Sequence, residues 1–453
     1  MSLSQSRLHP DLTRHVWRLG IAVALTAAAL VLCGAATAAP PPVLTPPEVR
    51  SAPGQFIVVA VANPVTGRPG AVGGTAHGYG SGTNYRVSAS AANTLQEIAR
   101  QYSLTAVSEW PIEQLKMHCV LFRIPPGTTR EAVVEKLKAD KRVLIVQPLN
   151  EFESAAAAAP EATPVPAASG SDDPYARLQS NVSALDVVEA HNFSRGAGIR
   201  VAIIDTGVDT HHPDLAGRAF VTRNFIDNDD VAFRSDRHGT QVAGLIAAAS
   251  DNGIGIVGVA PDVKLLAYKA CWQASANTAG RCNSFTIAQA LADALAAKAQ
   301  VINLSLVGPS DPLLEALIAR AIELGVIVVG AVADDPRLGF PARLPGVLPV
   351  AVAETSLSST ASPDGILRAP GRDIVTLVPN GHYDFASGNS LATAQISGVV
   401  ALLLARNQKL GAVRLREMLQ QSTERHDTTR GPFLSVNACT ALAMVVRGAS
   451  CAQ

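Results

Sequence analysis

The feature that most constrains the fold is the alternation of short apolar runs with alanine-rich stretches between Pro174 and the C-terminus. Runs such as RVAIIDTG, QVINLSL and GVIVVGAV have the length and β-branched content of buried strands, and the stretches between them are long enough for helices. Strands that alternate with helices form a parallel sheet covered on both faces. We therefore expect a doubly wound α/β domain over residues 173–453, with functional groups at the carboxyl ends of its strands.

A segment upstream has a different order of elements. From Gln55 to Phe152, strand-like and helix-like runs follow one another as β-α-β-β-α-β. This is the order of a small ferredoxin-like α+β domain. Residues 67–82 are glycine-rich without apolar periodicity, which indicates a loop. Residues 154–172 are mainly small residues and prolines, which predicts a linker between the two domains.

The N-terminal segment has the organisation of a secretory signal peptide. Arg7, Arg14 and Arg18 precede an uncharged run over residues 19–39, which ends in alanines. An uncleaved membrane anchor is the alternative, because the length of the run permits it. The Ala-x-Ala ending and the prolines that follow favour cleavage, so that residues 1–39 are removed. We expect an exported protein, periplasmic or extracellular, that is free of the membrane after signal removal.

The charge of the chain argues against one class of partner. The sequence contains 37 Lys and Arg residues and 37 Asp and Glu residues, and its formal net charge is +0. Proteins that bind nucleic acids need a basic surface to neutralise phosphates. We therefore expect no nucleic-acid partner.

Four cysteines in the second half of the chain form two close pairs, Cys271 with Cys282 and Cys439 with Cys451. An exported protein can oxidise both pairs. Pairing of near neighbours is one of three possible connectivities. We favour it because a disulfide that closes a short loop depends little on how the rest of the chain folds. Cys119 then has no partner and is expected to be a buried core residue. No set of Cys and His residues has the spacing of a structural zinc site.

Three segments of the large domain each carry one polar residue of an acyl-transfer site. Asp205 follows the strand-like VAII, His238 lies in RHGTQVAG, and Ser390 opens a long apolar helix after a Gly-Asn turn. A hydroxyl becomes a nucleophile when a base takes its proton, and an imidazole base needs a carboxylate to fix its tautomer. Taken singly, the three are explained as a strand-end turn residue, a helix-start residue and an N-cap. Together on this scaffold they indicate nucleophilic catalysis.

With these motifs, residues 174–445 resemble the subtilisin-like serine proteases of the peptidase S8 family. The resemblance runs through VAIIDTGVDTHHPDL, HGTQVAGLIAA, GIVGVAPDVKLLAYK, VINLSL and GNSLATAQISGVVALLL. It implies an endopeptidase that acts on polypeptides through an acyl-enzyme, with Asp205, His238 and Ser390 as its triad. Residues 40–153 resemble the inhibitor-I9-like propeptide of the family, which implies a self-processed zymogen whose own propeptide is an intramolecular inhibitor.

The chain departs from the family pattern at three positions. Asp334 occupies the position of the second oxyanion donor, which is usually Asn; an ionised carboxylate there would repel the oxyanion, and a protonated one could donate to it. Asn389 replaces the usual Thr before the nucleophile, and is either a substitute donor or a turn residue. In the expected substrate-aligning strand, Val307 follows Ser305 and Leu306 in place of the usual Gly. The pocket for the residue before the cut is therefore expected to be shallow and to suit Ala.

The resemblance also raises the question of a structural calcium ion. Asp214 and Asn252 match two ligand positions of a calcium site that is common in the family, and hard oxygen ligands suit calcium. Further ligands are not identified in the sequence, and a solvent-facing turn is the alternative. The acyl-transfer reaction itself requires no cofactor.

Three functions compete at this point. The first is a serine endopeptidase. The second is a catalytically silent relative that binds peptides or partners through the same cleft. The carboxylate of Asp334 is the reason to consider this function. The third is an esterase, because ester and amide cleavage share their intermediates.

Overall fold

The structure is a computed structural model that describes residues 42–64, 87–155, 171–273, 275, 278–335, 337–355, 365–428 and 431–451. Residues 42–68 and 85–453 belong to one compact unit, and the second unit, residues 1–41 and 69–84, lies outside the described residues. The expected signal peptide therefore lies outside them, as does the expected glycine-rich loop. In the described part of the chain, every helix is too short or too polar to cross a membrane.

The large domain is built on a seven-stranded sheet with the order β15-β14-β13-β11-β6-β8-β7. All of its neighbouring strands run parallel, which confirms the expected α/β class. The strands are β6 (Arg200–Asp205), β7 (Phe220–Asn224), β8 (Lys264–Lys269), β11 (Val301–Leu304), β13 (Ile327–Ala331), β14 (Leu348–Val352) and β15 (Leu367–Ala369).

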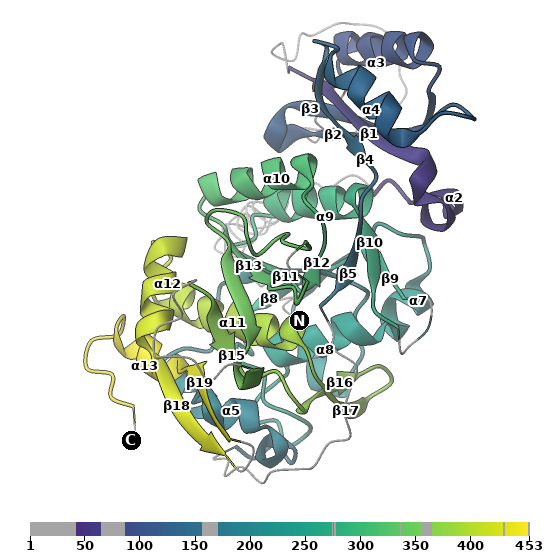
Figure 1. Ribbon diagram of the computed structural model, residues 1–453. Helices are drawn as coiled ribbons and strands as arrows, with labels where there is room; N and C mark the ends of the chain where they lie inside the picture. The colour runs from purple at the N-terminus through teal and green to yellow at the C-terminus, as the bar shows by residue number, and fades with distance from the viewer. Residues whose placement is uncertain are drawn as a thin grey trace, which may run out of the picture. The chain divides into compact units, whose positions relative to one another are not determined.

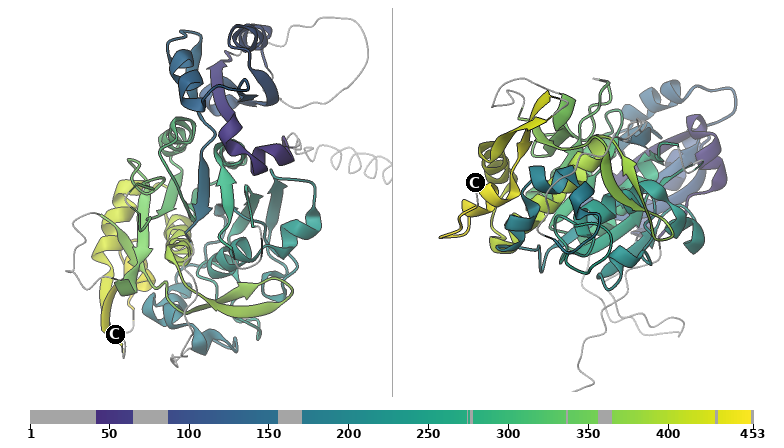
Figure 2. Two further views of the ribbon diagram at one scale, coloured as in Figure 1. Left: turned by 45° about the vertical axis from the view of Figure 1, so that its right-hand side comes forward. Right: turned by 90° about the horizontal axis from the view of Figure 1, so that it is seen from below.

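Helices cover both faces of this sheet (Figures 1 and 2). Along β6, Val201 and Ile203 pack into the core that contains α8 and α11, whereas Ala202 and Ile204 pack into the core that contains α9 and α10. Successive side chains of a strand point to opposite faces, so a continuous apolar run serves both cores. These helices are α8 (Arg237–Ala247), α9 (Ser284–Ala296), α10 (Pro312–Glu323) and α11 (Asn389–Arg406).

Shorter elements complete the large domain. The helices are α5 (Ser180–Ala184), α6 (Val187–His191), α7 (Asp230–Ser235), α12 (Ala412–Gln421) and α13 (Ala438–Ala443), with 3-10 turns η3 (Ala176–Leu178), η4 (Pro213–Leu215) and η5 (Ala353–Thr355). Two hairpins are formed by β16 (Ile374–Val378) with β17 (His382–Ala386) and by β18 (Thr423–Thr428) with β19 (Gly431–Val436).

The N-terminal region forms a separate four-stranded antiparallel sheet with the order β2-β3-β1-β4. Its elements follow the expected β-α-β-β-α-β order. After α2 (Pro47–Ser51) and η1 (Pro53–Gln55) they are β1 (Phe56–Ala62), α3 (Ala89–Gln101), β2 (Thr105–Ile112), β3 (Met117–Arg123), α4 (Arg130–Lys138) and β4 (Val143–Pro148), with η2 (Glu113–Leu115) between β2 and β3.

The four-stranded sheet shares a core with the large domain. Its strands alternate, so Ile57 and Val59 of β1 pack with α3 and α4, while Val58 and Ala60 belong to the core of α9 and α10. In that shared core the ring centroids of Trp110 and Phe285 are 4.7 Å apart.

A buried carboxylate also joins the two domains. Asp311 is the N-cap of α10, and its Oδ2 accepts hydrogen bonds from Gln147 Nε2 at 2.6 Å and Asn150 Nδ2 at 3.0 Å. Since Gln147 and Asn150 belong to the N-terminal region, polar and apolar contacts both hold it against the large domain.

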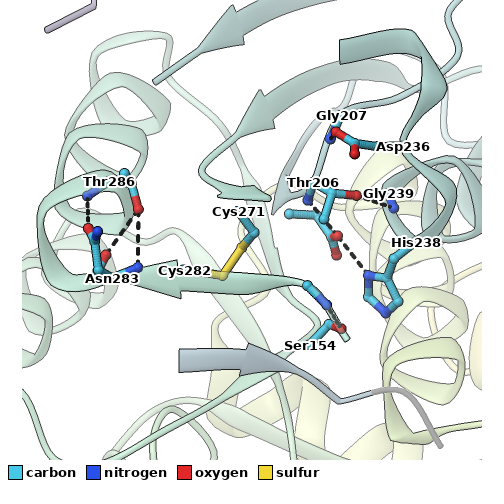
Figure 3. Close-up of a disulfide and its surroundings, with 12 residues drawn as sticks. Ser154, Thr206, Gly207, Asp236, His238, Gly239, Cys271, Cys282, Asn283 and Thr286 are labelled. Atoms are coloured by element: carbon cyan, nitrogen blue, oxygen red, sulfur yellow. Dashed lines mark hydrogen bonds and ion pairs between the residues drawn. A yellow bond between two sulfur atoms is a disulfide. The ribbon is translucent and has the colours of Figure 1, made fainter. Parts of the chain in front are cut away.

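Both expected disulfides are present. Cys271 of β9 (Cys271–Trp272) is bonded to Cys282 of β10 (Arg281–Asn283), as Figure 3 shows, and Cys439 of α13 is bonded to Cys451. Cys119 is buried with a free thiol, as expected, and burial raises the pKa of this thiol. The near-neighbour connectivity is therefore confirmed.

Candidate active site

The first part of the site joins the end of β6 to the start of α8. Asp205 is the last residue of β6 and is 2% exposed, and His238 is the second residue of α8 and is 3% exposed. His238 Nδ1 donates to Asp205 Oδ1 at 2.7 Å, and the same oxygen accepts from Thr206 N at 2.6 Å. This hydrogen bond fixes the imidazole tautomer and leaves Nε2 as the basic nitrogen.

Ser390 lies in the first turn of α11 and is fully buried. Gly388, the N-cap, has a φ of 147°, which a residue with a side chain rarely adopts. Ser390 Oγ and His238 Nε2 are both buried and lack a hydrogen-bond partner among the described residues. Buried polar atoms without a partner are uncommon in folded proteins, which keeps Ser390 and His238 as the candidate reacting groups.

A strand of the chain itself occupies the approach to Ser390. Strand β5 (Glu151–Ser154) pairs antiparallel with β12 (Leu306–Val307) on one side and with β10 on the other. Beyond it, Ala155 N donates to Ser305 O at 3.0 Å, and the backbone N–H of Ser390 donates to Ala155 O at 3.1 Å. The carbonyl of Ala155 therefore lies on the backbone amide of Ser390.

This arrangement moves one expected boundary. The composition predicts a linker from residue 154, but Ser154 ends β5 and Ala155 is held by two backbone hydrogen bonds. Small residues carry no apolar signal, and the hydrogen bonds that order them come from strands far away in sequence. The described residues of the expected linker resume at Ser171.

The segment that leads into β12 is connected to α11 by a chain of buried polar side chains that the sequence analysis missed. Ser397 Oγ donates to Asn303 Oδ1 at 2.9 Å, Asn303 Nδ2 donates to Ser305 Oγ at 3.0 Å, and Ser305 Oγ donates to the carbonyl of Ser390 at 3.0 Å. All four residues are 0% exposed. The signal available in the sequence was the pair of polar residues in the otherwise apolar VINLSL.

Two aromatic rings are in contact beside β5 and β12. Phe152 of β5 is 3% exposed, and its ring centroid lies 5.2 Å from that of Phe340. A Cβ atom added to Gly308 would lie 2.0 Å from the Phe152 ring, so glycine is required there while Phe152 is in place. Sequence reasoning missed this contact because Gly308 and Phe340 meet only through a bridge between distant segments.

The two candidate oxyanion residues differ in their surroundings. Asp334 lies in the loop after β13 and is exposed. Asn389 Nδ2 donates to Val332 O at 2.8 Å, and its Oδ1 accepts from Val352 N at 2.8 Å. The Asn389 amide therefore joins the ends of β13 and β14, which favours the turn-residue interpretation over that of a substitute donor.

The residues of the expected calcium site converge as a hydrogen-bonded group. Burial raises the pKa of Asp214 to about 7, and its oxygens accept from Asn252 Nδ2 at 3.3 Å and Ile256 N at 2.8 Å. Asn252 Oδ1 accepts from Ile254 N at 3.0 Å. Calcium needs several converging oxygens, whereas N–H donors surround this carboxylate, so the arrangement does not fit the ion.

Another cluster with metal-ligating residue types is explained by covalent chemistry. Within the described ranges, Asp186 lies with Cys439 and Cys451, their ligand atoms within 4.8 Å of one another. The two cysteines form a disulfide, so they offer no thiolate to a metal.

The comparisons with known proteins agree with this geometry. The model of the Subtilase family (Peptidase_S8) matches residues 196–438. The chain is 36% identical over 228 residues to an intracellular serine protease of Paenibacillus polymyxa, covering 47% of this chain and 68% of the relative. It is 31% identical over 251 residues to thermitase of Thermoactinomyces vulgaris, covering 54% and 88%.

A solved structure supports the fold. The crystal structure of fervidolysin from Fervidobacterium pennivorans, described as a keratinolytic enzyme related to subtilisin, superposes with a TM-score of 0.67 at 23% identity, covering 86% of this chain and 60% of that chain. The seven-stranded parallel sheet, the juxtaposed Asp205 and His238, the matching family model and the serine-protease relatives lead to one conclusion: this chain belongs to the subtilase family.

Proposed function

We propose that this chain is an exported, self-processed serine endopeptidase in which Ser390 is the nucleophile. His238 Nε2 takes the Ser390 proton as Oγ attacks a peptide carbonyl, and later returns a proton to the leaving amine. Asp205 holds the imidazole through the 2.7 Å bond to Nδ1 and stabilises the imidazolium. Water then hydrolyses the acyl-enzyme, and the chemistry uses no cofactor.

One observation carries the proposal. The carbonyl of Ala155 accepts the backbone N–H of Ser390 at 3.1 Å, while residues 151–154 form a strand between β10 and β12. This is the pose of a substrate, with its carbonyl oxygen on a donor that would stabilise a developing oxyanion. It supports residues 40–155 as an intramolecular inhibitor and the Ala155–Ala156 bond as the processing site.

The same strand supports a substrate preference. A small residue stands before the proposed cut, and Phe152, three residues earlier, is buried against Gly308 and Phe340. Polypeptides with Ala at the first position before the cut and a large aromatic at the fourth are the proposed substrates.

The decisive experiment compares wild type with Ser390→Ala in a protease-deficient host. Wild type should yield a mature chain that begins at Ala156, whereas Ser390→Ala should keep its N-terminal domain and lose only the signal peptide. N-terminal sequencing and intact mass measure both. His238→Ala is the matched control, because it should also block processing while Ser390 remains present. Identical trimming of all three proteins would show that processing is not self-catalysed.

The exposed Asp334 favours a second candidate, a silent relative that binds peptides without cleaving them. Reaction with a fluorophosphonate probe separates the two. An active serine is labelled at Ser390 once the N-terminal domain is removed, whereas a silent protein stays unlabelled. Rates on matched ester and amide substrates then distinguish an endopeptidase from an esterase.

A further inference from the structure

A buried ion pair lies beside the Asp205–His238 pair. Lys269, the last residue of β8, is 3% exposed, and Asp236, directly before α8, is 9% exposed. Lys269 Nζ donates to Asp236 Oδ2. The same oxygen accepts from the backbone N–H of Gly207 at 2.7 Å. Since burial of an ion pair removes two charges from water, such a pair is weak evidence for stability and calls for another explanation.

Asp236 occupies the N-cap position of α8 without capping that helix. An N-cap Asp usually accepts a hydrogen bond from its own helix, which stabilises the helix. The Asp236 side chain makes no such bond and is directed instead toward Gly207 and Lys269. The helix that carries His238 therefore lacks a side-chain cap, because the Asp236 carboxylate contacts the turn after Asp205 instead.

Consecutive residues at the end of β6 and in the turn after it each form a hydrogen bond with a residue at the start of α8. Besides the Asp205–His238 bond, Gly239 N donates to Thr206 Oγ1 at 2.9 Å, and Gly207 N donates to Asp236 Oδ2. Figure 3 shows Thr206 beside Gly239 and Gly207 beside Asp236. Added Cβ atoms at Gly207 and Gly239 would lie 1.9 Å from Phe233 O and 2.4 Å from Gly207 O, so the two segments are in backbone contact.

Lys269 also lies next to Asp205 in the sheet. The two residues are partners in the parallel register of β6 and β8, and Ala270 N donates to Asp205 O at 2.9 Å. Two carboxylates, Asp205 and Asp236, therefore share a buried region with one ammonium. Burial raises the pKa of Asp236, and the Lys269 charge opposes that shift.

We propose that Asp236 and Lys269 are positioning residues for the Asp205–His238 pair, the carboxylate fixing the turn after Asp205 against the start of α8 and the ammonium offsetting the two carboxylates. The inference rests on the proposed function of the triad. Other charged residues nearby on α7 and α8, Arg234 and Arg237, are partly exposed, and Arg237 pairs with Asp384 of β17 at 2.5 Å. Solvent screens these groups, whereas Lys269 is buried.

The test uses two isosteric variants whose charge effects are opposite. Asp236→Asn leaves the Lys269 cation unpaired beside the triad, which disfavours an imidazolium, so the acidic limb of the kcat/KM profile should move to lower pH. Lys269→Met leaves two carboxylates, so the limb should move to higher pH. Each displacement should be about 0.5 pH unit or more. Lys264→Met is the matched control, because Lys264 is the exposed residue at the other end of β8.

Rates are measured per active site titrated with a fluorophosphonate probe, so incompletely folded protein does not contribute. Opposite displacements with an unchanged limb in Lys264→Met support the inference. The inference is overturned if the acidic limbs of Asp236→Asn and Lys269→Met move in the same direction, or if neither limb moves. If a single variant fails to fold, the double variant Asp236→Asn/Lys269→Met decides. A wild-type acidic limb with a kcat about threefold or more below that of wild type supports the inference, whereas a wild-type kcat overturns it. Activity that survived in Ser390→Ala would instead refute the proposed function.

Discussion

The two halves of the candidate active site differ in how firmly the fold holds them. Asp205 and His238 are buried, hydrogen-bonded to each other, and set on segments that are joined through successive residues. On the proposed oxyanion side, Asp334 is exposed in a loop, and the side-chain amide of Asn389 is hydrogen-bonded to the backbone of Val332 and Val352. In the proposed mechanism the base-and-carboxylate half is therefore preorganised, and the oxyanion half would depend mainly on the backbone N–H of Ser390. The predictions below test this contrast.

The largest effect is expected for Asp205→Asn. Its amide keeps the size of the carboxylate but favours the wrong imidazole tautomer, so kcat should fall by about 10⁴-fold with little change in KM. Steady-state kinetics on a peptide with Ala before the cut measure this. Asp209→Asn, a change at another buried aspartate four positions on, is the control and should cost far less activity. Equal losses would mean that burial of charge, rather than the bond to His238, is what matters.

Asp334→Asn should raise activity. A neutral amide at this position could donate to the oxyanion, where an ionised carboxylate repels it, and one such donor contributes on the order of 10²–10³ in kcat. We expect a gain of about tenfold or more in kcat/KM at neutral pH. Asp335→Asn, in the same loop, is the control. A loss of activity at every pH in Asp334→Asn would give the carboxylate an integral role.

Val307→Gly should change specificity rather than rate. Val307 lies in β12 opposite Glu153 of the bound strand and is buried, so its two methyl groups restrict the adjacent space. The ratio of kcat/KM for Ala over Phe before the cut should fall by about tenfold, because pocket contacts of this size are worth about 1–3 kcal/mol. A peptide library profile measures the ratio. A wild-type profile that already favours Phe would show that Val307 does not limit the pocket.

Asn389→Thr should have a small effect on chemistry and a larger one on stability. The substitution removes the bridge between Val332 and Val352, which should lower the free energy of unfolding by about 1–2 kcal/mol. If the amide has only this structural task, kcat per titrated active site should stay within about threefold of wild type. Denaturant unfolding in the Ser390→Ala background gives the first quantity. A hundredfold fall in kcat would instead identify Asn389 as the missing oxyanion donor.

The smallest effect is expected from removal of calcium. N–H donors surround the carboxylate of Asp214, so EDTA should shift the thermal midpoint of the mature protein by no more than about 2 °C. Thermal unfolding with EDTA and with added CaCl₂ provides the comparison, and MgCl₂ serves as the control for ionic strength. A calcium-specific rise of about 10 °C would show that Asn252 and its loop rearrange to present oxygens to the ion.

The sequence by itself determined the elements whose signal is local. Continuous apolar runs such as VAII predicted buried parallel strands, because both faces of such a strand are covered. Asp205 was expected at the end of one such run, and His238 in the separate segment RHGTQVAG. The two disulfides followed from short spacing. Even the β-α-β-β-α-β order upstream was readable, since strand alternation and helical periodicity extend over only a few residues.

The tertiary structure alone decided what depends on contacts between distant segments. Ser154 was expected to begin a linker that includes Ala155, yet hydrogen bonds with Gly280, Ser305 and Ser390 hold these two residues beside Ser390. Likewise the sequence analysis assigned no role to Asp236, and the role proposed for it beside Asp205 and His238 rests on its contacts with Gly207 and Lys269. Hydrogen bonds and ion pairs have no periodicity along the chain, so their partners become visible only when folding brings the strand ends together.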